Sequence, residues 1–164
     1  MKIIDANPTD PRVIAMVAEL DQMMMALYPA ESNYLTDPIS LTNGANKFFG
    51  VEIEGELVGI GALMEFDRYG EVKRIFVHPK SRGNGVATAI LNRLEREARS
   101  LGLVAMKLET GTKQPDAIAL FEREGFVTCD AFGDYPVGDP YSVFMQKKLC
   151  HGSLFSGEFL VSHK

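Results

Sequence analysis

The feature that most constrains the fold is a run in which a strand, a short basic loop and a long helix follow one another. Residues 71–77 have the pattern of a central strand, and an amphipathic helix is predicted over residues 83–101. Val86, Ile90 and Leu94 fall on one face of that helix. Such a run is typical of a strand–helix–strand unit, so we expect the next strand to be parallel, with a right-handed crossover.

The remaining pattern completes a mixed α/β domain. Glu54-Gly55 suits a tight hairpin turn between two antiparallel strands, and Tyr69-Gly70 indicates a second turn. The predicted order is β-α-β-β-β-α-β-α-β-β, an α/β fold with one mixed central sheet. The other strands are predicted over residues 2–6, 48–53, 57–66, 104–109, 126–129 and 142–148, and the other helices over residues 11–28 and 115–124.

Length and charge argue against several classes of function. The 164 residues suit one domain, which we place at residues 1–149, followed by a tail at residues 150–164. The net charge of −5 argues against a nucleic-acid partner, because phosphate backbones are bound by clustered basic residues. No apolar run approaches the ~18 residues that span a bilayer, so we expect a cytoplasmic protein without a membrane partner. Two cysteines and three scattered histidines predict neither a disulfide framework nor a metal site.

The densest chemistry lies in residues 77–87, which read Val-His-Pro-Lys-Ser-Arg-Gly-Asn-Gly-Val-Ala. The first turn of a helix has backbone N–H groups without intrahelical partners, and together with the helix dipole they form an anion site. Gly83 and Gly85 allow the backbone to approach a phosphate closely, and Lys80 and Arg82 add positive charge. We therefore predict a ligand that carries a pyrophosphate.

Two common phosphate loops do not match this segment. A P-loop requires Lys-Ser or Lys-Thr after its last glycine, and neither follows Gly85. A dinucleotide fingerprint requires a third glycine where Thr88 stands, and Glu109 lies too far along to supply its acidic residue. The remaining match is Arg-x-x-Gly-x-Ala, at Arg82, Gly85 and Ala87.

This match resembles the signature of the GNAT acyltransferase superfamily, [QR]-x-x-G-x-[GA] after a strand that ends in V-x-P, here Val77 and Pro79. A second family motif, N-x-x-A-x-x-L-Y-E-x-x-G-F, corresponds to residues 114–126, which read Q-P-D-A-I-A-L-F-E-R-E-G-F. The resemblance covers about residues 48–148. It implies a central sheet that splays at Val77 and an acetyl-CoA-dependent N-acetyltransferase without a metal.

The resemblance also implies which residues hold acetyl-CoA. Backbone groups at the end of the central strand would bind the pantetheine arm as an added strand does. The N–H groups of residues 82–87 would hold the pyrophosphate. The residues assigned to acetyl-CoA are Ile75, Phe76, Val77, Lys80, Arg82, Gly83, Asn84, Gly85, Val86, Ala87, Gln114 and Phe121.

Acetylation of an amine requires the uncharged amine, which for a primary alkylamine is less than about 0.1% of the total at pH 7. Glu71 is the predicted general base, because several GNAT enzymes carry a catalytic glutamate at this position. Even spacing on the strand predicts that Glu71, Lys73, Ile75 and Val77 share one face. The alternative for Glu71 is a structural ion pair with Lys73.

Phe121 departs from the family pattern, because many members have a tyrosine there that protonates the leaving thiolate. Phenylalanine has no proton to donate. Tyr135 and Tyr141 are the predicted replacements, and the alternative for each is packing with a satisfied hydroxyl. A thiol is also a fair leaving group without assistance.

The acceptor is expected between the segment after the first helix and residues 132–142, a loop that lines the acceptor site in similar proteins. The residues assigned to it are Tyr28, Glu31, Tyr34, Glu109 and Asp134, with turn formation or ion pairing as the alternative for the acidic ones. The predicted acceptor is a primary amine of a small molecule. A peptide or protein acceptor, and a non-catalytic acyl-CoA-binding module suggested by Phe121, remain alternatives. A homodimer is common among similar proteins.

Overall fold

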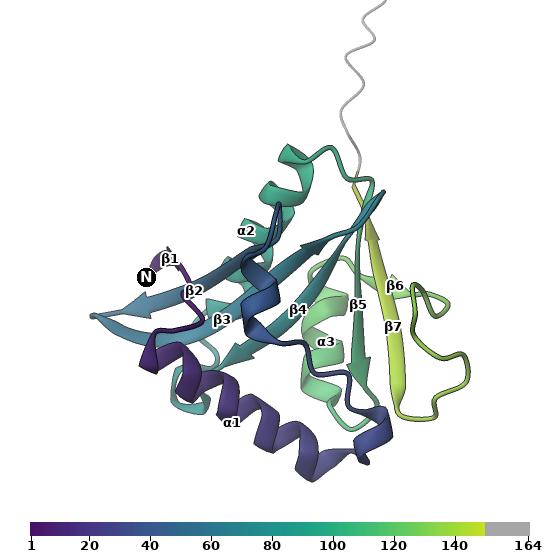
Figure 1. Ribbon diagram of the computed structural model, residues 1–164, viewed down its shortest axis with the longest axis horizontal. Coiled ribbons are helices and arrows are strands. Elements are labelled where there is room, and N and C mark those ends of the chain that lie inside the picture. Colours follow the sequence, from purple (N-terminus) through teal and green to yellow (C-terminus); the bar gives the residue numbers. More distant parts are fainter. Residues whose placement is uncertain (150–164) are drawn as a thin grey trace, which may run out of the picture.

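The computed structural model describes residues 1–149, which form one seven-stranded mixed sheet covered by helices (Figure 1). The strand order in space is β1-β2-β3-β4-β5-β7-β6. Only β4 and β5 pair in parallel within this range, which confirms the predicted mixed fold and the parallel unit around α2. The strands are β1 (Lys2–Asp5), β2 (Lys47–Ile53), β3 (Glu56–Glu65), β4 (Tyr69–Val77), β5 (Ala105–Gly111), β6 (Val127–Thr128) and β7 (Ser142–Lys148). The helices are α1 (Pro11–Leu27), α2 (Val86–Ser100) and α3 (Pro115–Arg123), with 3₁₀ turns at Ala30–Ser32, Pro38–Thr42 and Pro79–Ser81.

The helices cover opposite faces of the sheet (Figure 1). On one face the buried residues Val13, Val17 and Leu20 of α1 form a core with Ile60 of β3 and Phe76 of β4. The larger core on the other face includes Val86, Ile90, Leu91, Leu94 and Ala98 of α2, Phe121 of α3, and Leu63, Val72, Met106 and Leu108 of the strands.

Two glycines of β3 allow α2 to lie close to the sheet. A Cβ at Gly59 would lie 2.7 Å from Val86 Cγ1, and a Cβ at Gly61 would lie 2.4 Å from Ile90 Cγ2. Folded proteins do not contain carbon contacts this short, so a side chain at either position must push α2 away. This contact holds the start of α2 beside β4.

We expect Gly61→Val to lower the free energy of unfolding by roughly 1–3 kcal/mol, because the new methyl groups overpack the contact with Ile90. Thermal unfolding followed by circular dichroism measures the effect. Ala26→Val, on the exposed side of α1, is the control and should cost less than about 0.7 kcal/mol. Equal unfolding temperatures for both variants would contradict the close approach of α2.

A β-bulge in β4 changes which of its side chains share a face. The register with β3 shifts between Ile60 and Ala62, and Arg74 has a left-handed φ of 58°. Lys73 lies opposite Ala62. Phe76, only three residues further on, lies opposite Ile60 and therefore points to the same face. The alternation of the strand is thus interrupted at Arg74.

The bulge overturns one prediction. Ile75 and Val77 pack against the core beneath α2, whereas Glu71 and Lys73 point to the face that carries α1. The prediction that these four residues share one face is therefore wrong, because even spacing assumes an unbroken strand. The consequence is that the two charged residues are separated from the two apolar ones by the sheet itself.

β4 and β5 are paired over only three residues each. The parallel ladder joins Tyr69–Glu71 to Ala105–Lys107, and in the described range it extends no further. β4 continues to Val77 paired with β3 only, while β5 pairs with β7 as far as Gly111. The predicted splay is present, but it begins after Glu71, earlier in the strand than Val77.

Other predicted boundaries also differ. Tyr69-Gly70 begins β4, and the turn precedes it, where the Phe66 amide donates to the Tyr69 carbonyl. The strand predicted over residues 126–129 is reduced to two residues at the sheet edge. No helix of residues 1–149 is long and apolar enough to cross a membrane. The predicted tail at residues 150–164 lies outside the described residues.

Candidate active site

Two spaces meet where β4 and β5 diverge. A groove of about 630 Å³ lies between the start of α2 and α3, and we call it the α2–α3 groove. A smaller space of about 160 Å³, here called the inner cavity, lies between α1, the two diverging strands and the loop before β7. Ile75 and Gln114 line both spaces, so the two adjoin.

The open end of the α2–α3 groove is formed by the loop before α2. The helix begins at Val86 and not at Gly83 as predicted, because Gly83 and Gly85 have φ angles of 80° and 77°, which an α-helix does not contain. Gly85 is the N-cap residue and supplies no side-chain cap, so the first-turn amides depend on another acceptor. No atom lies within 4 Å of a Cβ built on either glycine, which leaves room for an anion.

The charge of this groove also suits an anion. Its charged lining residues are Arg82, Lys113 and Arg123 against one carboxylate, Asp116. Arg82 is fixed to the strand end, because its Nε donates to the Val77 carbonyl at 3.0 Å. Cations beside a helix N-terminus reinforce the attraction for phosphate.

The structure brings most of the predicted acetyl-CoA residues together. Three do not line the α2–α3 groove: Lys80 and Asn84 lie on the exposed loop, and Phe121 lines the inner cavity instead. The residues that line the groove are Ile75, Phe76, Val77, Arg82, Gly83, Gly85, Val86, Ala87 and Gln114.

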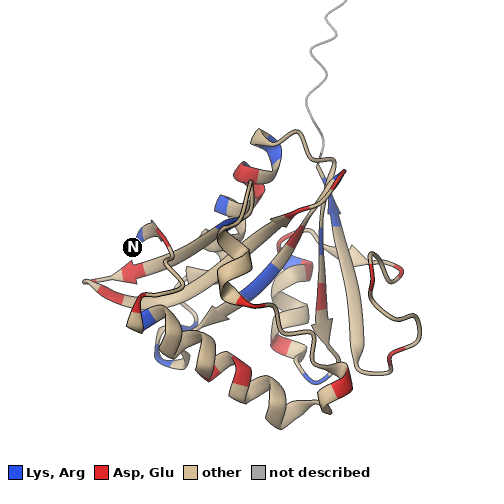
Figure 2. Ribbon diagram, in the orientation of Figure 1, with Lys and Arg blue, Asp and Glu red and all other residues tan. Residues whose placement is uncertain are grey.

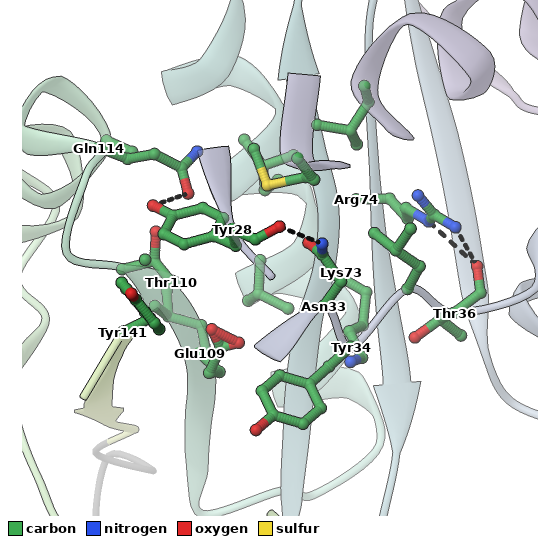
Figure 3. A pocket seen from close by; sticks show the side chains of 18 of the residues that line it. Tyr28, Asn33, Tyr34, Thr36, Lys73, Arg74, Glu109, Thr110, Gln114 and Tyr141 are labelled. Carbon is green, nitrogen blue, oxygen red and sulfur yellow. Dashed lines mark hydrogen bonds between the residues drawn. The ribbon is translucent and has the colours of Figure 1, made fainter. Parts of the chain in front are cut away.

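Tyrosines form much of the wall of the inner cavity. Tyr28 and Tyr141 meet edge to face with ring centroids 6.0 Å apart, and Tyr34 and Tyr135 do so at 5.1 Å. Figure 3 shows Tyr28, Tyr141 and Tyr34 around the carboxylate of Glu109. Such a wall offers apolar ring surface together with hydroxyl groups that hold a ligand in one orientation.

Tyr28 is held in place from two sides. It is 7% exposed; its hydroxyl donates to Gln114 Oε1 at 3.3 Å and accepts from the Lys113 amide at 3.1 Å. Its ring rests on Gly111, where a Cβ would lie 1.9 Å from the hydroxyl oxygen. Only glycine fits at position 111, so the end of β5 is shaped to receive this tyrosine.

Glu71 lies behind the wall of the inner cavity and is 4% exposed. The Tyr135 hydroxyl donates to its carboxylate, and the Lys73 ammonium lies 3.3 Å from Glu71 Oε1. Lys73 also donates to the Tyr135 oxygen at 2.6 Å. Burial and the adjacent Glu71 charge raise the pKa of Tyr135 far above its usual value, so the phenol keeps its proton. The ion pair with Lys73, predicted as the alternative for Glu71, is present, and the role of Glu71 as general base stays a prediction.

The carboxylate of Glu109 points into the inner cavity from β5 and has no hydrogen bond or ion pair with any residue of the described range. Burial raises the pKa of Glu109 to about 7. The nearby Lys73 charge opposes this increase, while the Asp139 and Glu71 charges add to it. The carboxyl group therefore exchanges its proton near neutral pH.

Asp139 joins the two loops that close the inner cavity. Its carboxylate accepts from the Tyr34 hydroxyl at 2.5 Å and from the Ser32 hydroxyl at 3.2 Å, and the Tyr141 amide completes the site at 2.9 Å. The hydrogen bond to Asp139 raises the pKa of Tyr34 to about 12, and the same bond lowers the pKa of Asp139. The link orders the cavity mouth.

Two predicted acceptor residues lie elsewhere. Glu31 and Asp134 are exposed, and neither lines the inner cavity. Sequence reasoning missed Arg74, whose side chain is 6% exposed and pairs with Asp21 of α1 and the Thr36 carbonyl. No local sequence signal predicts this role, because it depends on the bulge in β4. Across residues 1–149, no three His, Cys, Asp or Glu side chains are grouped so as to hold a metal ion.

Known proteins share this architecture. The IAA acetyltransferase of Azospirillum brasilense is 42% identical over 145 residues, which cover 87% of this chain and 94% of that protein. The crystal structure of a putative acyl-CoA N-acyltransferase from Klebsiella pneumoniae subsp. pneumoniae MGH 78578 is 34% identical with a TM-score of 0.76, covering 91% of this chain and 97% of that one.

A more distant structure shows the same fold with a ligand. An aminoglycoside 6'-N-acetyltransferase complexed with coenzyme A has a TM-score of 0.69 at 16% identity and covers 90% of this chain and 97% of its own. The sequence model described as "Acetyltransferase (GNAT) family" matches residues 14–126, which include both motifs, the bulged strand and the start of α2. The chain therefore belongs to the GNAT family of acetyltransferases and is an enzyme of the N-acetyltransferase class.

Proposed function

We propose that this protein transfers the acetyl group of acetyl-CoA to an amine of a small molecule that binds in the inner cavity. The observation that carries the proposal is the unpaired, half-buried carboxylate of Glu109 beside the opening that joins the cavity to the α2–α3 groove. A general base must reach the amine and must be able to accept a proton near neutral pH. Among the residues that line the cavity, Glu109 meets both requirements.

The α2–α3 groove fits acetyl-CoA, which would supply the acetyl thioester. The first-turn amides of α2 and Arg82 suit its pyrophosphate, for the reasons of charge and space given above. The His78 amide donates to the Val58 carbonyl of β3. Because amides alternate in direction along a strand, the Val77 amide points away from β3, toward the groove. It is placed to donate a hydrogen bond to the thioester carbonyl oxygen.

In the proposed reaction the acceptor amine attacks directly from the inner cavity. The N–C bond of the amide forms, the C–S bond of the thioester breaks, and one amine proton passes to Glu109. Both substrates are bound at once, since the two spaces adjoin at Ile75. No covalent acetyl-enzyme is required.

The thiolate is proposed to leave without a protein acid. Phe121 lines the inner cavity and packs edge to face against Phe126 at 5.9 Å, so it serves as a wall. Tyr135 is a poor donor, because its proton is held by Glu71. Tyr141 meets Tyr28 edge to face, so we assign it to the wall of the cavity and not to proton transfer.

The size of the inner cavity favours a small acceptor over a peptide. A volume of about 160 Å³ bordered by two linked loops holds on the order of ten heavy atoms, since a water-sized group occupies about 10–15 Å³ of such a volume. An assay of free-thiol release from acetyl-CoA across a panel of small amines and peptides tests the proposal. Turnover with small amines supports the proposal, and turnover with peptides alone contradicts it. A lack of thiol release with every acceptor would contradict the transfer itself and favour the binding-module alternative.

Tyr34→Phe tests the closure of the cavity. We expect the KM of the acceptor to rise about threefold to tenfold, the range of an ordinary hydrogen bond, because solvent screens the charge of Asp139. The Kd of coenzyme A, measured by calorimetry, should stay the same. Tyr69→Phe, outside the inner cavity, is the control. If the KM of the acceptor rises equally in Tyr34→Phe and Tyr69→Phe, Tyr34 has no specific effect on the acceptor.

A further inference from the structure

Opposite charges face each other across the opening between β4 and β5. The last parallel pair joins Glu71 to Lys107, and two residues further along each strand stand Lys73 and Glu109. Both line the inner cavity. Figure 2 shows the same relation, with a basic stretch in the middle of β4 beside an acidic segment of β5.

These two residues do not form an ion pair with each other. Within residues 1–149 the only carboxylate within 4.0 Å of the Lys73 ammonium is that of Glu71. Yet Lys73 is close enough for its charge to act on the pKa of Glu109. The gap between the two groups is therefore part of the inner cavity, and it separates a cation from an anion.

Lys73 has a donor to spare. An ammonium can donate three hydrogen bonds; Lys73 donates one to the Tyr135 oxygen and forms an ion pair with Glu71 at 3.3 Å. Its side chain is 15% exposed, and the remaining N–H group has no acceptor in the described part of the chain. Arg74 is the other cation of the lining, and it is occupied by Asp21 and the Thr36 carbonyl. Lys73 is thus the cation available to a ligand.

We propose that the acceptor is a small amino acid, whose amine meets Glu109 and whose carboxylate meets Lys73. This inference rests on the proposed acetyl transfer and names the chemical class of its acceptor. A half-buried carboxylate is costly unless it is paired, and so is a buried donor that has no acceptor. A zwitterion satisfies Glu109 and the remaining N–H donor of Lys73 at once. A plain amine satisfies Glu109 alone, and a plain carboxylic acid satisfies Lys73 alone.

The tyrosine wall sets the size of the amino acid. Tyr28, Tyr34 and Tyr141 enclose the space around Glu109, and the whole cavity holds about 160 Å³. We expect short apolar or aromatic side chains that contact the rings to be preferred. A long charged side chain of the acceptor would have to extend out of the cavity between the two loops that Asp139 links.

The test compares each amino acid with the amine that lacks its carboxylate, such as alanine with ethylamine and phenylalanine with phenethylamine. We expect kcat/KM to be about 100-fold higher for the amino acid, because an acceptor without the carboxylate leaves the remaining N–H donor of Lys73 without an acceptor. Equal or faster turnover of the plain amines would overturn the inference and leave the proposed acetyl transfer intact. Turnover of neither series would refute both.

The variant Lys73→Met tests whether Lys73 causes the preference for amino acids over plain amines. We expect kcat/KM for amino acids to fall about 100-fold relative to that for plain amines, so that the preference disappears. Any effect of Lys73 on the pKa of Glu109 is common to both series. Lys73→Arg should restore part of it, since a guanidinium also pairs with a carboxylate. Lys148→Met, at an exposed position of β7, is the matched control. A loss that is equal for both series, with unchanged coenzyme A affinity and unfolding temperature, would contradict a role in reading the carboxylate.

Discussion

Glu109→Gln is expected to lower kcat about 10²- to 10⁴-fold, the usual range for removing a general base, with the Kd of coenzyme A unchanged. The amide keeps the shape of the carboxyl group but accepts no proton from the amine. Steady-state kinetics of thiol release, with calorimetry for coenzyme A, measures both quantities. Glu56→Gln, at an exposed position at the start of β3, is the control. Full activity of Glu109→Gln would remove this residue from the mechanism.

The pH dependence distinguishes Glu109 from Glu71. Burial raises the pKa of Glu109 to about 7, and only its ionised form is a base, so kcat/KM should rise with pH through about 7. The groups that face it are Lys73, Asp139, Glu71, Tyr28, Tyr34 and Tyr135. The rise of kcat/KM through about pH 7 should be absent in Glu109→Gln and present in Glu71→Gln. The reverse result would return the role of base to Glu71.

Glu109 should also reduce the stability of the folded protein at pH values above about 7. The pKa of Glu109 is about 7 in the folded protein against 4.5 for a free glutamate side chain. The stability that this raised pKa contributes is complete below the lower value and is lost as pH rises through the higher one. We therefore expect Glu109→Gln to be more stable than the wild type at pH 8, by up to about 3 kcal/mol, and equally stable near pH 4. Urea unfolding at both pH values measures this difference. A gain in stability with a loss of activity is typical of a strained functional group.

Gly85→Glu is expected to abolish binding of acetyl-CoA. The new carboxylate would stand at the N-terminus of α2, in the space that is open beside Gly85 and that we assign to the pyrophosphate. Like charges about 4 Å apart repel by about 4 kcal/mol at an effective dielectric constant of 20, which corresponds to roughly a thousandfold loss of affinity. Isothermal titration with coenzyme A measures it.

Gly102→Glu is a matched control at the other end of the same helix. Gly102 also has a left-handed φ, 73° against 77° for Gly85, and a Cβ there would likewise meet nothing within 4 Å. Both variants therefore carry the same charge and a similar backbone strain of about 1–2 kcal/mol. Gly102→Glu should bind coenzyme A normally. If both variants lose binding equally, the cause is loss of structure, and if neither does, the pyrophosphate lies elsewhere.

Much of the architecture followed from local patterns. The amphipathic spacing of α2 and the hairpin at Glu54-Gly55 predicted elements that the structure contains, and the strand–helix–strand run predicted the parallel pair. The glycines at positions 83 and 85 marked the loop correctly but were placed inside the helix. Their positive φ angles are incompatible with an α-helix, so the helix begins only after Gly85. Sequence spacing alone does not show which glycines adopt such angles.

The candidate site was only partly accessible to the same reasoning. Tyr28, Tyr34 and Glu109 were named as acceptor residues, and the structure places all three in the inner cavity. Glu31 and Asp134 were named on the same grounds of charge and loop position, and both lie outside it. A loop residue is placed by the contacts of its backbone, here the Asp139 link, which no spacing rule contains.

The sequence by itself determined the order of the elements, the family and the position of the loop before α2, because periodicity, glycines and short motifs act over a few neighbouring residues. Only the tertiary structure decided which charged groups meet. The bulge at Arg74 turned Glu71 and Lys73 to the α1 face, and the early divergence of β4 from β5 opened the space between Lys73 and Glu109. Both events depend on pairing between distant strands, so the burial that raises the pKa of Glu109 could not be read from its neighbours along the chain.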